Sequence, residues 1–351
     1  MKRPRALARS VYRRIAPLVS ATRLAGDRVS EADVRAAYRL LLGRVPDPDG
    51  WQSFSAMVGI APTSDLVGAL LSSEEFRRTA MHSALMRRER DDLEEVDASD
   101  GLRLLVSPHD LSNQGLLRRG SYETHLARAL DDVLRPGMSF CAVGANVGYH
   151  VVRAAHRVGP RGRVFAFEAH PGNALLVARS VALNRFENTT VLPFAVADRR
   201  TLHRYVAAQG TNGYLEPLDA QVSSDADTLR SALLIQSICL DDLLGLLSPI
   251  DVLQIDIEGG EGRALRGAQR LLAENRPVVF SELCLGQLSR NSAMSGEEYL
   301  GGLRSLGYGF AVLGFDGAIT PFGDDVERLC AYARAQSTSH IDIRCAPSER
   351  R

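Results

Sequence analysis

Four acidic residues near the ends of two apolar runs are the side chains of this sequence best suited to chemistry. Asp256, Glu258 and Glu261 fall in the stretch DVLQIDIEGGE, and Glu282 ends the apolar run VVFSE. In a strand, Asp256 and Glu258 point to the same side, because successive side chains alternate. A Gly-Gly turn follows, at the carboxyl end of the strand. Carboxylates gathered there indicate either a general base of raised pKa or the ligands of a divalent metal.

The same carboxylates also have a structural interpretation. Glu261 lies in the first turn of the expected helix, where an acid satisfies free backbone N–H groups. Glu282 could equally be a solvated strand end. Asp256, Glu258 and Glu282 are therefore candidate catalytic residues, and Asp256, Glu258 and Glu261 are the candidate metal ligands. The choice between base and metal stays open at this point.

An earlier stretch combines a strand, a glycine turn and a helix. The apolar run 138–143 leads into the turn GANVG at 144–148, and apolar residues then recur at helical spacing as far as Gly159. A second strand ends at Glu168, roughly 20 residues after the turn. This βαβ pattern predicts a nucleoside cofactor, since the glycines let the backbone approach the ligand and the carboxylate accepts from both ribose hydroxyls.

The turn also discriminates between cofactors. A dinucleotide site needs G-x-G-x-x-G, and here Asn146 stands where a glycine would sit. That spacing favours a ligand without a pyrophosphate, such as S-adenosylmethionine, over NAD. An NAD-dependent sugar-modifying enzyme on the same sheet is the disfavoured alternative. His150, just after the turn, is a weaker candidate base, because a lone histidine on a helix is more often structural.

Length and composition limit the classes of protein to which the chain can belong. The chain has 351 residues, of which 45% are apolar and 24% charged, as expected of a globular protein with one large and one small domain. The net charge is zero, so the chain as a whole lacks the excess of basic residues that is typical of proteins that bind nucleic acid. The five cysteines contain no C-x-x-C pair, so they predict reduced thiols in the cytoplasm rather than zinc or disulfides. No run approaches the roughly 20 apolar residues of a membrane span.

Strands and helices alternate after Glu168, which predicts an α/β fold with a mostly parallel sheet and helices on both faces. A helix is expected over 260–275. The last strand, around 341–345, is expected to be antiparallel at or near the edge of the sheet. The polar stretch 208–232 is expected to be an insertion over the cofactor face, because loops at that face usually carry specificity.

Four segments make up the expected domain organisation. Residues 1–28 form a basic tail, which is either frayed or lies against an anionic membrane surface as a peripheral contact. Residues 29–79 form a small helical domain. Residues 80–100 are a charged linker or helix, and residues 101–351 form the sheet domain.

The helical segment begins with Ser30, a helix N-cap with Asp33 three residues later. Asp47 and Asp49 belong to a turn rather than a calcium loop, because too few oxygen ligands follow. The strings LLGRVPDPDGW and LLSSEEF resemble a short helical domain of unknown function that occurs in bacterial surface and glycan-related proteins.

The sheet domain also supports a family resemblance, over roughly residues 115 to 346. The strings FCAVGANVGYHVV, GRVFAFEAHPGN, IDVLQIDIEGGEGRALRGA and PVVFSE resemble the FkbM family of S-adenosylmethionine-dependent methyltransferases. The resemblance implies a Rossmann-like class I methyltransferase that methylates hydroxyl oxygens, often on sugars of glycans, glycolipids or natural products. The residues that it implies for cofactor binding are Gly144, Ala145, Asn146 and Gly148 in the turn, Glu168 at the ribose, Ala195 to Asp198 near the adenine, and Asp256 facing the methyl group.

Two departures from the family pattern concern the strands that lead to the site. The family usually has an aspartate two residues before the first glycine of the turn, and this chain has Ala142. Gln254 replaces a usual lysine. The loss of the acid predicts weaker cofactor binding, and it leaves a catalytically degenerate adaptor, docking through the helical domain, as the second hypothesis. The turn and Glu168 are intact, so the enzyme is the favoured interpretation.

Overall fold

The computed structural model describes most of the chain. The described residues are 28–42, 44–61, 63–71, 73–77, 93–98, 100–108, 114–207, 213–218 and 233–348. The basic tail expected over 1–28, up to residue 27, and residues 80–92 of the expected linker lie outside them.

Short helices occupy the segment from residue 31 to residue 77. They are α2 (Glu31–Ala37), the π-helix η1 (Tyr38–Leu42), α3 (Pro48–Ser55), α4 (Thr63–Leu71) and α5 (Glu74–Arg77). The Ser30 hydroxyl accepts from the Asp33 backbone N–H, and the Asp33 carboxylate accepts from the Ser30 backbone N–H. Asp47 caps α3 by accepting from the Gly50 backbone N–H at 2.8 Å, which is the structural role expected of this turn. Val34 and Leu66 are fully buried in the apolar core between these helices.

An antiparallel pair of strands precedes the main sheet. Strand β1 (Glu94–Asp97) pairs with β2 (Arg103–Val106). Residues 94–97 were expected to belong to a linker or helix, and that expectation is wrong. The four residues form a strand because β2 supplies a complete ladder of backbone partners, while the acidic side chains of β1 stay exposed.

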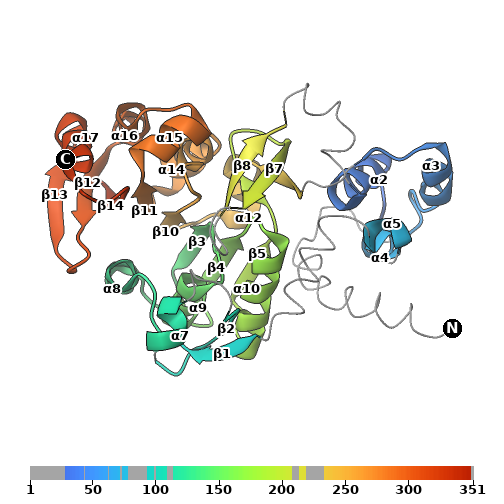
Figure 1. The fold of residues 1–351 in the computed structure, drawn as a ribbon, viewed down its shortest axis with the longest axis horizontal. Coiled ribbons are helices and arrows are strands. Elements are labelled where there is room, and N and C mark those ends of the chain that lie inside the picture. The colour runs from blue at the N-terminus through green and yellow to red at the C-terminus, as the bar shows by residue number, and fades with distance from the viewer. Residues whose placement is uncertain are drawn as a thin grey trace.

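An eight-stranded sheet forms the centre of the molecule (Figure 1), in the order β13-β12-β14-β11-β10-β3-β4-β5. The strands are β3 (Ser139–Val143), β4 (Arg163–Phe167), β5 (Thr189–Leu192), β10 (Val252–Ile255), β11 (Val278–Leu283), β12 (Tyr308–Leu313), β13 (Ile319–Gly323) and β14 (Ile341–Pro347). Strands β5, β4, β3, β10 and β11 pair in parallel. The α/β class and the mostly parallel sheet are therefore confirmed.

The last strand is antiparallel, as predicted, but it does not lie at the edge. Strand β14 runs antiparallel between β11 and β12, and the hairpin strand β13 forms the edge instead. Ile341, Asp342 and Ile343 are all buried, as an interior strand covered on both faces requires.

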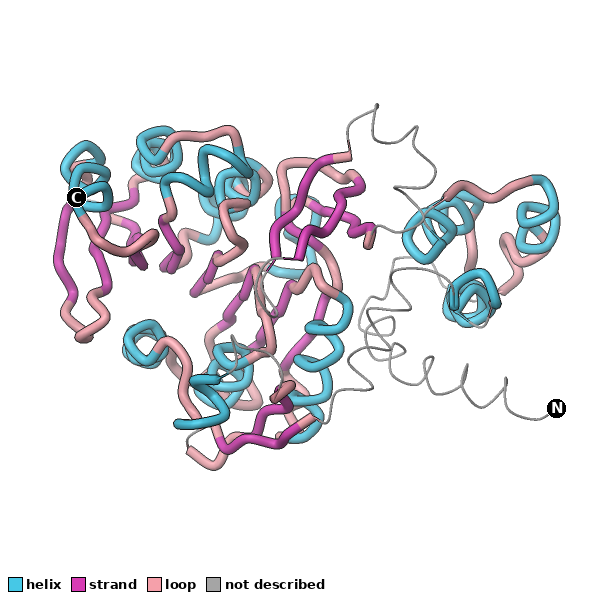
Figure 2. Tube along the Cα trace, in the orientation of Figure 1, coloured by secondary structure: helices cyan, strands magenta, loops and turns pink. Residues whose placement is uncertain are grey.

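Helices cover both faces of the sheet (Figures 1 and 2). They are α7 (Gln114–Arg119), α8 (Thr124–Val133), α9 (Tyr149–Val158), α10 (Pro171–Leu183), η4 (Leu240–Leu243), α12 (Leu244–Leu247), α13 (Glu261–Arg266), α14 (Gln269–Asn275), α15 (Leu285–Ser292), α16 (Gly296–Ser305) and α17 (Val326–Ala335). Alternation along β3 sends Cys141 and Val143 into the core under α13 to α17, and Phe140 and Ala142 into the core under α8 to α10.

The helix expected over 260–275 is two helices. It breaks at Gly267, where an added Cβ would lie 2.0 Å from the Ala197 carbonyl oxygen. The close approach of the two backbones therefore fixes the break.

A smaller sheet lies beside β5 and contains β6 (Ala195–Val196), β9 (Leu234–Ile238), β7 (Leu202–Ala207) and β8 (Gly213–Pro217) in that order. Strand β8 falls within the stretch expected to be an insertion over the cofactor face. The remainder of that stretch, apart from Leu218, lies outside the described residues.

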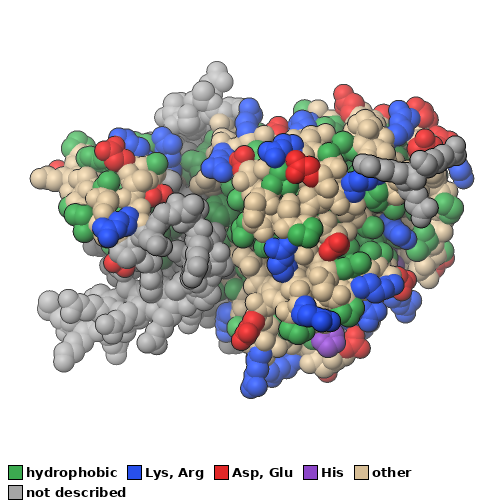
Figure 3. Space-filling view, turned by 180° about the vertical axis from the view of Figure 1, so that it is seen from behind, with side chains coloured by type: hydrophobic (Ala, Val, Ile, Leu, Met, Phe, Trp, Pro, Cys, Tyr) green, Lys and Arg blue, Asp and Glu red, His purple; other side chains and the backbone are tan. Residues whose placement is uncertain are grey.

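The surface is mixed in charge. On the described part of the face in Figure 3, acidic and basic side chains are interspersed, in keeping with the net charge of zero. Within the described ranges, no helix is long and apolar enough to cross a membrane.

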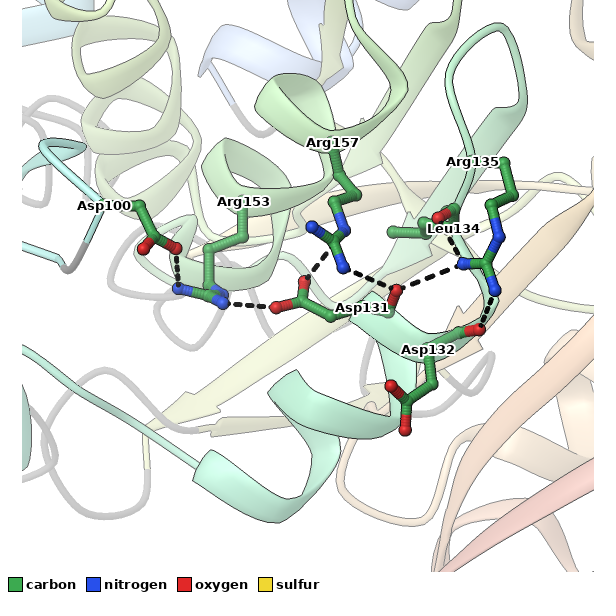
Figure 4. Close-up of polar contacts among 7 residues, drawn as sticks. All are labelled: Asp100, Asp131, Asp132, Leu134, Arg135, Arg153 and Arg157. Carbon is green, nitrogen blue, oxygen red and sulfur yellow. Dashed lines mark hydrogen bonds and ion pairs between the residues drawn. The ribbon is translucent and has the colours of Figure 1, made fainter.

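Helix α8 is fixed onto α9 by a group of charged side chains (Figure 4). Asp131 of α8 contacts Arg153 of α9 at 2.6 Å, and its backbone carbonyl accepts from Arg157 at 3.0 Å. Asp100 pairs with the far side of Arg153 at 3.5 Å. Arg135 donates to the carbonyls that end α8. These contacts consequently fix the C-terminal end of α8 against α9.

Candidate active site

An open cavity of about 920 Å³ lies beyond the carboxyl ends of β3, β4 and β10. Gly144, Asn146, Glu168, Ala195, Asp256 and Glu258 are among the residues that line it. The carboxyl ends of parallel strands are where this class of sheet binds ligands. The structure therefore brings together two constellations that are far apart in the sequence.

The glycine turn is compact because its residues adopt left-handed backbone conformations. Gly144 has φ +90°, and a Cβ there would lie 1.8 Å from the Asp256 carbonyl oxygen. Asn146 has φ +49°. Gly148 begins α9 at φ +94° and packs against Val177 of α10. The turn therefore places its own backbone at the wall of the cavity. It also lets the end of β10 approach the turn closely.

Glu168 follows β4 and is 7% exposed. Its carboxylate accepts from the backbone N–H of Asn146 at 2.7 Å and from that of His170 at 2.8 Å. These two donors fix the carboxylate at the wall of the cavity. A carboxylate accepts at about four sites, so the same group can also accept from ribose hydroxyls.

The segment expected near the adenine divides between two environments. Ala195 lines the cavity together with its apolar neighbours Phe194 and Val196. Asp198 does not line it, and its carboxylate instead pairs with Arg266 of α13 at 3.3 Å. Ala197 also lines the cavity, so Asp198 is the residue of this segment that lies outside it.

A row of carboxylates crosses three neighbouring strands on the face covered by α8. Asp256 follows β10, Glu282 lies on β11, and Asp342 on β14 is the register partner of Glu282. Oxygen atoms of Asp256, Glu261 and Glu282 lie within 4.8 Å of one another. His340 lies 3.5 Å from Glu282, and His125 of α8 contacts Asp342 at 2.5 Å. Strand register, which joins distant parts of the chain, assembles this row.

Burial and mutual repulsion raise the pKa values of this cluster. Burial raises the pKa of Asp256 well above its usual range, and the charge of Glu282 adds to the effect. Burial, reinforced by Glu261, raises the pKa of Glu282 to about 9. Burial also raises the pKa of Glu261 to about 7, against the opposing effect of its backbone donors. The cluster therefore retains protons at neutral pH, as closely spaced carboxyls do.

Glu261 and Glu258 have separate surroundings. Glu261 accepts from the backbone N–H groups of Ile257 at 2.9 Å and Gly259 at 3.2 Å, which is the structural role considered for it. Glu258 has φ +55°, and its carboxylate accepts from Gln287 at 2.9 Å. Its carboxylate is not part of the group that Asp256 forms with Glu261 and Glu282, although Glu258 still lines the cavity.

The predicted metal triad of Asp256, Glu258 and Glu261 is consequently not the group that the structure gathers. Glu282 takes the place of Glu258, because β11 brings it beside the end of β10. A divalent ion at this position would be held by Asp256, Glu261 and Glu282.

A second cavity, of about 440 Å³, lies next to the first. It is lined by Glu123, at the N-cap of α8, and by His150, whose Nε2 lies 3.0 Å from the Glu123 carboxylate. His150 is thus paired in this cavity and does not belong to the Asp256 cluster. Glu123 was not singled out from the sequence. Nothing local marks it, since α8 brings it to the turn from outside the βαβ unit.

Residues 142–310 match the family model described as the methyltransferase FkbM domain. The chain carries an FkbM methyltransferase domain. The matched region runs from Ala142 in β3 to Phe310 in β12, so it contains the glycine turn, Glu168 and the acidic cluster. The activity of this domain is methyl transfer, and its cofactor is S-adenosylmethionine. No curated protein matches the chain.

Several solved structures are similar to this FkbM-domain protein. An FkbM methyltransferase from Methylobacillus flagellatus KT is 14% identical, over 88% of this chain and 58% of that one, with a TM-score of 0.38. A precorrin-6y C5,15-methyltransferase from Geobacter metallireducens GS-15 is 15% identical, over 64% and 87% of the two chains, with a TM-score of 0.35. A putative methyltransferase from Streptococcus mutans in complex with SAH is 9% identical, over 64% and 94%, with a TM-score of 0.36.

The residues of the FkbM domain fit the cofactor. Glu168 offers a buried carboxylate that can accept from hydroxyl groups, Phe194 and Ala195 offer an apolar wall, and Gly144 lets the end of β10 approach the turn, because a Cβ there would collide with the Asp256 carbonyl oxygen. Asp256 borders both cavities.

Proposed function

We propose that this domain transfers the methyl group to a hydroxyl oxygen of a sugar in a glycan or glycolipid. The observation that supports this is the Asp256–Glu282 carboxyl pair at the wall of the cofactor cavity. A hydroxyl is a weak nucleophile near its normal pKa, so its methylation benefits from a base within hydrogen-bond reach. A carboxylate held beside the reacting methyl group meets that need.

The reaction is an in-line displacement. The cofactor supplies an electrophilic methyl group on a sulfonium. The acceptor oxygen forms a bond to the methyl carbon as the carbon–sulfur bond breaks, and Asp256 takes the hydroxyl proton. The electron pair of the broken bond stays on sulfur. Alignment by the cavity walls supplies much of the rate, because it replaces a bimolecular encounter.

The charge state of Asp256 depends on what lies in the cavity. A nearby positive charge favours the ionised form of a carboxyl. A cationic ligand therefore lowers the pKa of Asp256 and prepares it as a base. Glu282 can then take up the proton and pass it to His340, which lies 3.5 Å away with about a third of its side chain exposed (35%).

The walls of the cavity suit an acceptor with several hydroxyl groups. Arg263 and Asn291 offer N–H donors, and Glu258 offers a carboxylate. Tyr205 adds an aromatic surface. Burial lowers the pKa of Arg263, although its guanidinium stays charged at neutral pH. The resemblance of the helical segment to domains of glycan-related proteins supports the same class of acceptor.

Transfer of labelled methyl from S-adenosylmethionine to a cell-envelope glycan fraction tests the proposal. We expect label that survives mild alkali and is recovered as an O-methyl sugar after acid hydrolysis. Glu168→Ala should abolish incorporation, while Glu187→Ala, on the exposed surface, should match the wild type. Equal incorporation by wild type and Glu168→Ala would contradict the ribose assignment. Label found only in alkali-labile esters would contradict transfer to a hydroxyl.

The same assay distinguishes a base from a metal at the acidic cluster. Activity that survives exhaustive chelation, and that magnesium or manganese does not raise, assigns Asp256 as a base without an ion. Activity lost on chelation and restored by an ion assigns Asp256, Glu261 and Glu282 as its ligands. Calorimetry that finds no binding of S-adenosylmethionine would instead favour the adaptor hypothesis.

A further inference from the structure

Arg263 brings a positive charge to the wall of the first cavity. It lies on α13, which begins at Glu261 shortly after Asp256, and both Arg263 and Asp256 line this cavity. Among the described residues that line it, Arg263 is the one arginine or lysine. The other charged groups of the wall are the carboxyl groups of Glu168, Asp256 and Glu258. The acceptor therefore meets a single cationic side chain in this cavity.

The guanidinium of Arg263 has no counter-ion in the part of the chain that the structure describes. No carboxylate there lies within ion-pair distance of it. Asp198, whose charge acts on Arg263, instead pairs with Arg266 at 3.3 Å. Arg263 is also partly buried. A partly buried charge without a partner costs free energy, so its position at a cavity wall indicates a ligand of the opposite charge.

His203 of β7 adds a hydrogen-bond acceptor to the same cavity wall. Its Nε2 lies 3.0 Å from Ser237 Oγ, and this hydroxyl uses its one proton in the 2.7 Å hydrogen bond to the carbonyl oxygen of Arg199. Nε2 must therefore donate to Ser237, which leaves Nδ1 without a proton in the neutral ring. The ring is neutral because burial lowers the pKa of His203 to about 4, and the charge of Arg263 adds to that effect. Nδ1 is consequently an acceptor, and no described residue donates to it.

The two groups together define the chemistry of a ligand. Arg263 is a charged donor and His203 a neutral acceptor, so the matching ligand carries an anion beside a hydrogen-bond donor. A sugar carboxylate next to a ring hydroxyl has this arrangement. The carboxylate accepts two parallel N–H bonds from the planar guanidinium, and the hydroxyl can donate to Nδ1. A phosphate monoester matches less well, because it carries roughly two negative charges at neutral pH.

We propose that the acceptor is an acidic glycan, and that Arg263 binds one of its carboxylates while His203 accepts from a neighbouring hydroxyl. The carboxylates of Glu168 and Glu258 would otherwise repel such an acceptor, so the arginine decides whether it binds. Arg263 and His203 are thus specificity-determining residues that select a glycan containing uronic acid over a neutral one. The inference rests on the proposed methylation of a glycan hydroxyl.

Removal of the carboxylates from the acceptor tests this with the wild type alone. One portion of the cell-envelope glycan fraction is left untreated. In a second portion the carboxyl groups are reduced to alcohols with carbodiimide and borohydride, and a third portion is dephosphorylated with cold aqueous hydrogen fluoride. We expect reduction to lower the incorporation of labelled methyl at least about tenfold, and dephosphorylation to leave it within about twofold. Incorporation that survives reduction would overturn the inference, and so would incorporation that depends on phosphate.

Variants assign the effect to the two residues. Arg263→Gln removes the charge, and His203→Gln keeps a donor toward Ser237 but removes the acceptor at Nδ1. Arg304→Gln, on the exposed side of α16, is the control and should match the wild type. We expect Arg263→Gln to raise the KM for the untreated glycan by about 10- to 100-fold, and His203→Gln by about 2- to 10-fold.

The KM for S-adenosylmethionine separates an acceptor site from a cofactor site. It should stay within about twofold of the wild type in both variants. An increase equal to that for the glycan would overturn the inference, since both residues would then contact the cofactor. Arg263→Gln should also label untreated and reduced glycan to nearly the same extent, which a general loss of folding would not produce.

Two results distinguish this inference from the proposed function. If the wild type labels no glycan at all, the proposed function itself fails. If it produces an O-methyl sugar equally well with and without the carboxyl groups, only this inference fails.

Discussion

Replacing Glu282 by glutamine should move the pH dependence of methyl transfer to lower pH. The oxygens of Glu282 and Asp256 lie within 4.8 Å of each other, and the charge of Glu282 raises the pKa of Asp256. An ionised Glu282 therefore opposes the ionisation of Asp256. Glutamine keeps the size of the side chain and removes that charge, which lowers the pKa of Asp256. Since ionised Asp256 accepts the hydroxyl proton, the rising part of the rate profile follows this pKa.

The distance between the carboxyls sets the size of the shift. Their oxygens lie within 4.8 Å. Two unit charges at that separation interact by about 3.5 kcal/mol at an effective dielectric constant of about 20. That energy corresponds to about 2.5 pKa units. Solvent in the open cavity weakens the interaction, so we expect the profile to move by about 1 to 2.5 pH units.

The assay measures kcat/KM for methyl transfer from about pH 5 to pH 10, which spans the raised carboxyl values. Glu274→Gln, on the exposed side of α14, is the matched control and should leave the profile unmoved. A profile that does not shift in Glu282→Gln would refute the charge coupling between Glu282 and Asp256. An activity lost at every pH would show that Glu282 itself is required for the chemistry.

The same variant has a stability signature. The pKa of Glu282 rises on folding from its ordinary value of 4.5 to about 9, so folding takes up protons in this range. The wild type therefore loses stability relative to Glu282→Gln as the pH rises from 4.5 to about 9. Denaturant unfolding at several pH values measures this difference.

Two further predictions concern the turns that build the site. Gly144→Ala should lower the free energy of unfolding by about 2 to 4 kcal/mol and abolish cofactor binding, because its Cβ would collide with a backbone oxygen at φ +90°. Gly301→Ala, which adds a Cβ in open space on α16, should be neutral or stabilising in the same denaturant titration. Glu261→Ala should cost about 1 to 3 kcal/mol, since it leaves the Ile257 and Gly259 N–H groups without an acceptor. Glu261→Gln keeps an acceptor, so an equal loss in both variants would contradict that role.

The sequence by itself determined the local units of this protein. Periodicity located β3, the turn and α9, because the spacing of apolar residues in a strand or helix depends only on neighbours along the chain. The capping pair of Ser30 and Asp33 was predicted for the same reason and is confirmed. The alternation of strands and helices predicted the parallel sheet, and the family strings predicted the FkbM domain and its cofactor.

The tertiary structure decided which of these units meet. Register between β10 and β11 puts Glu282 beside Asp256, while the Glu258 carboxylate accepts from Gln287, so the acidic group differs from the one that spacing suggested. Glu123 reaches the turn only because α8 packs on α9. Strand pairing and helix packing join residues that are distant in the chain, and no local pattern encodes the partner.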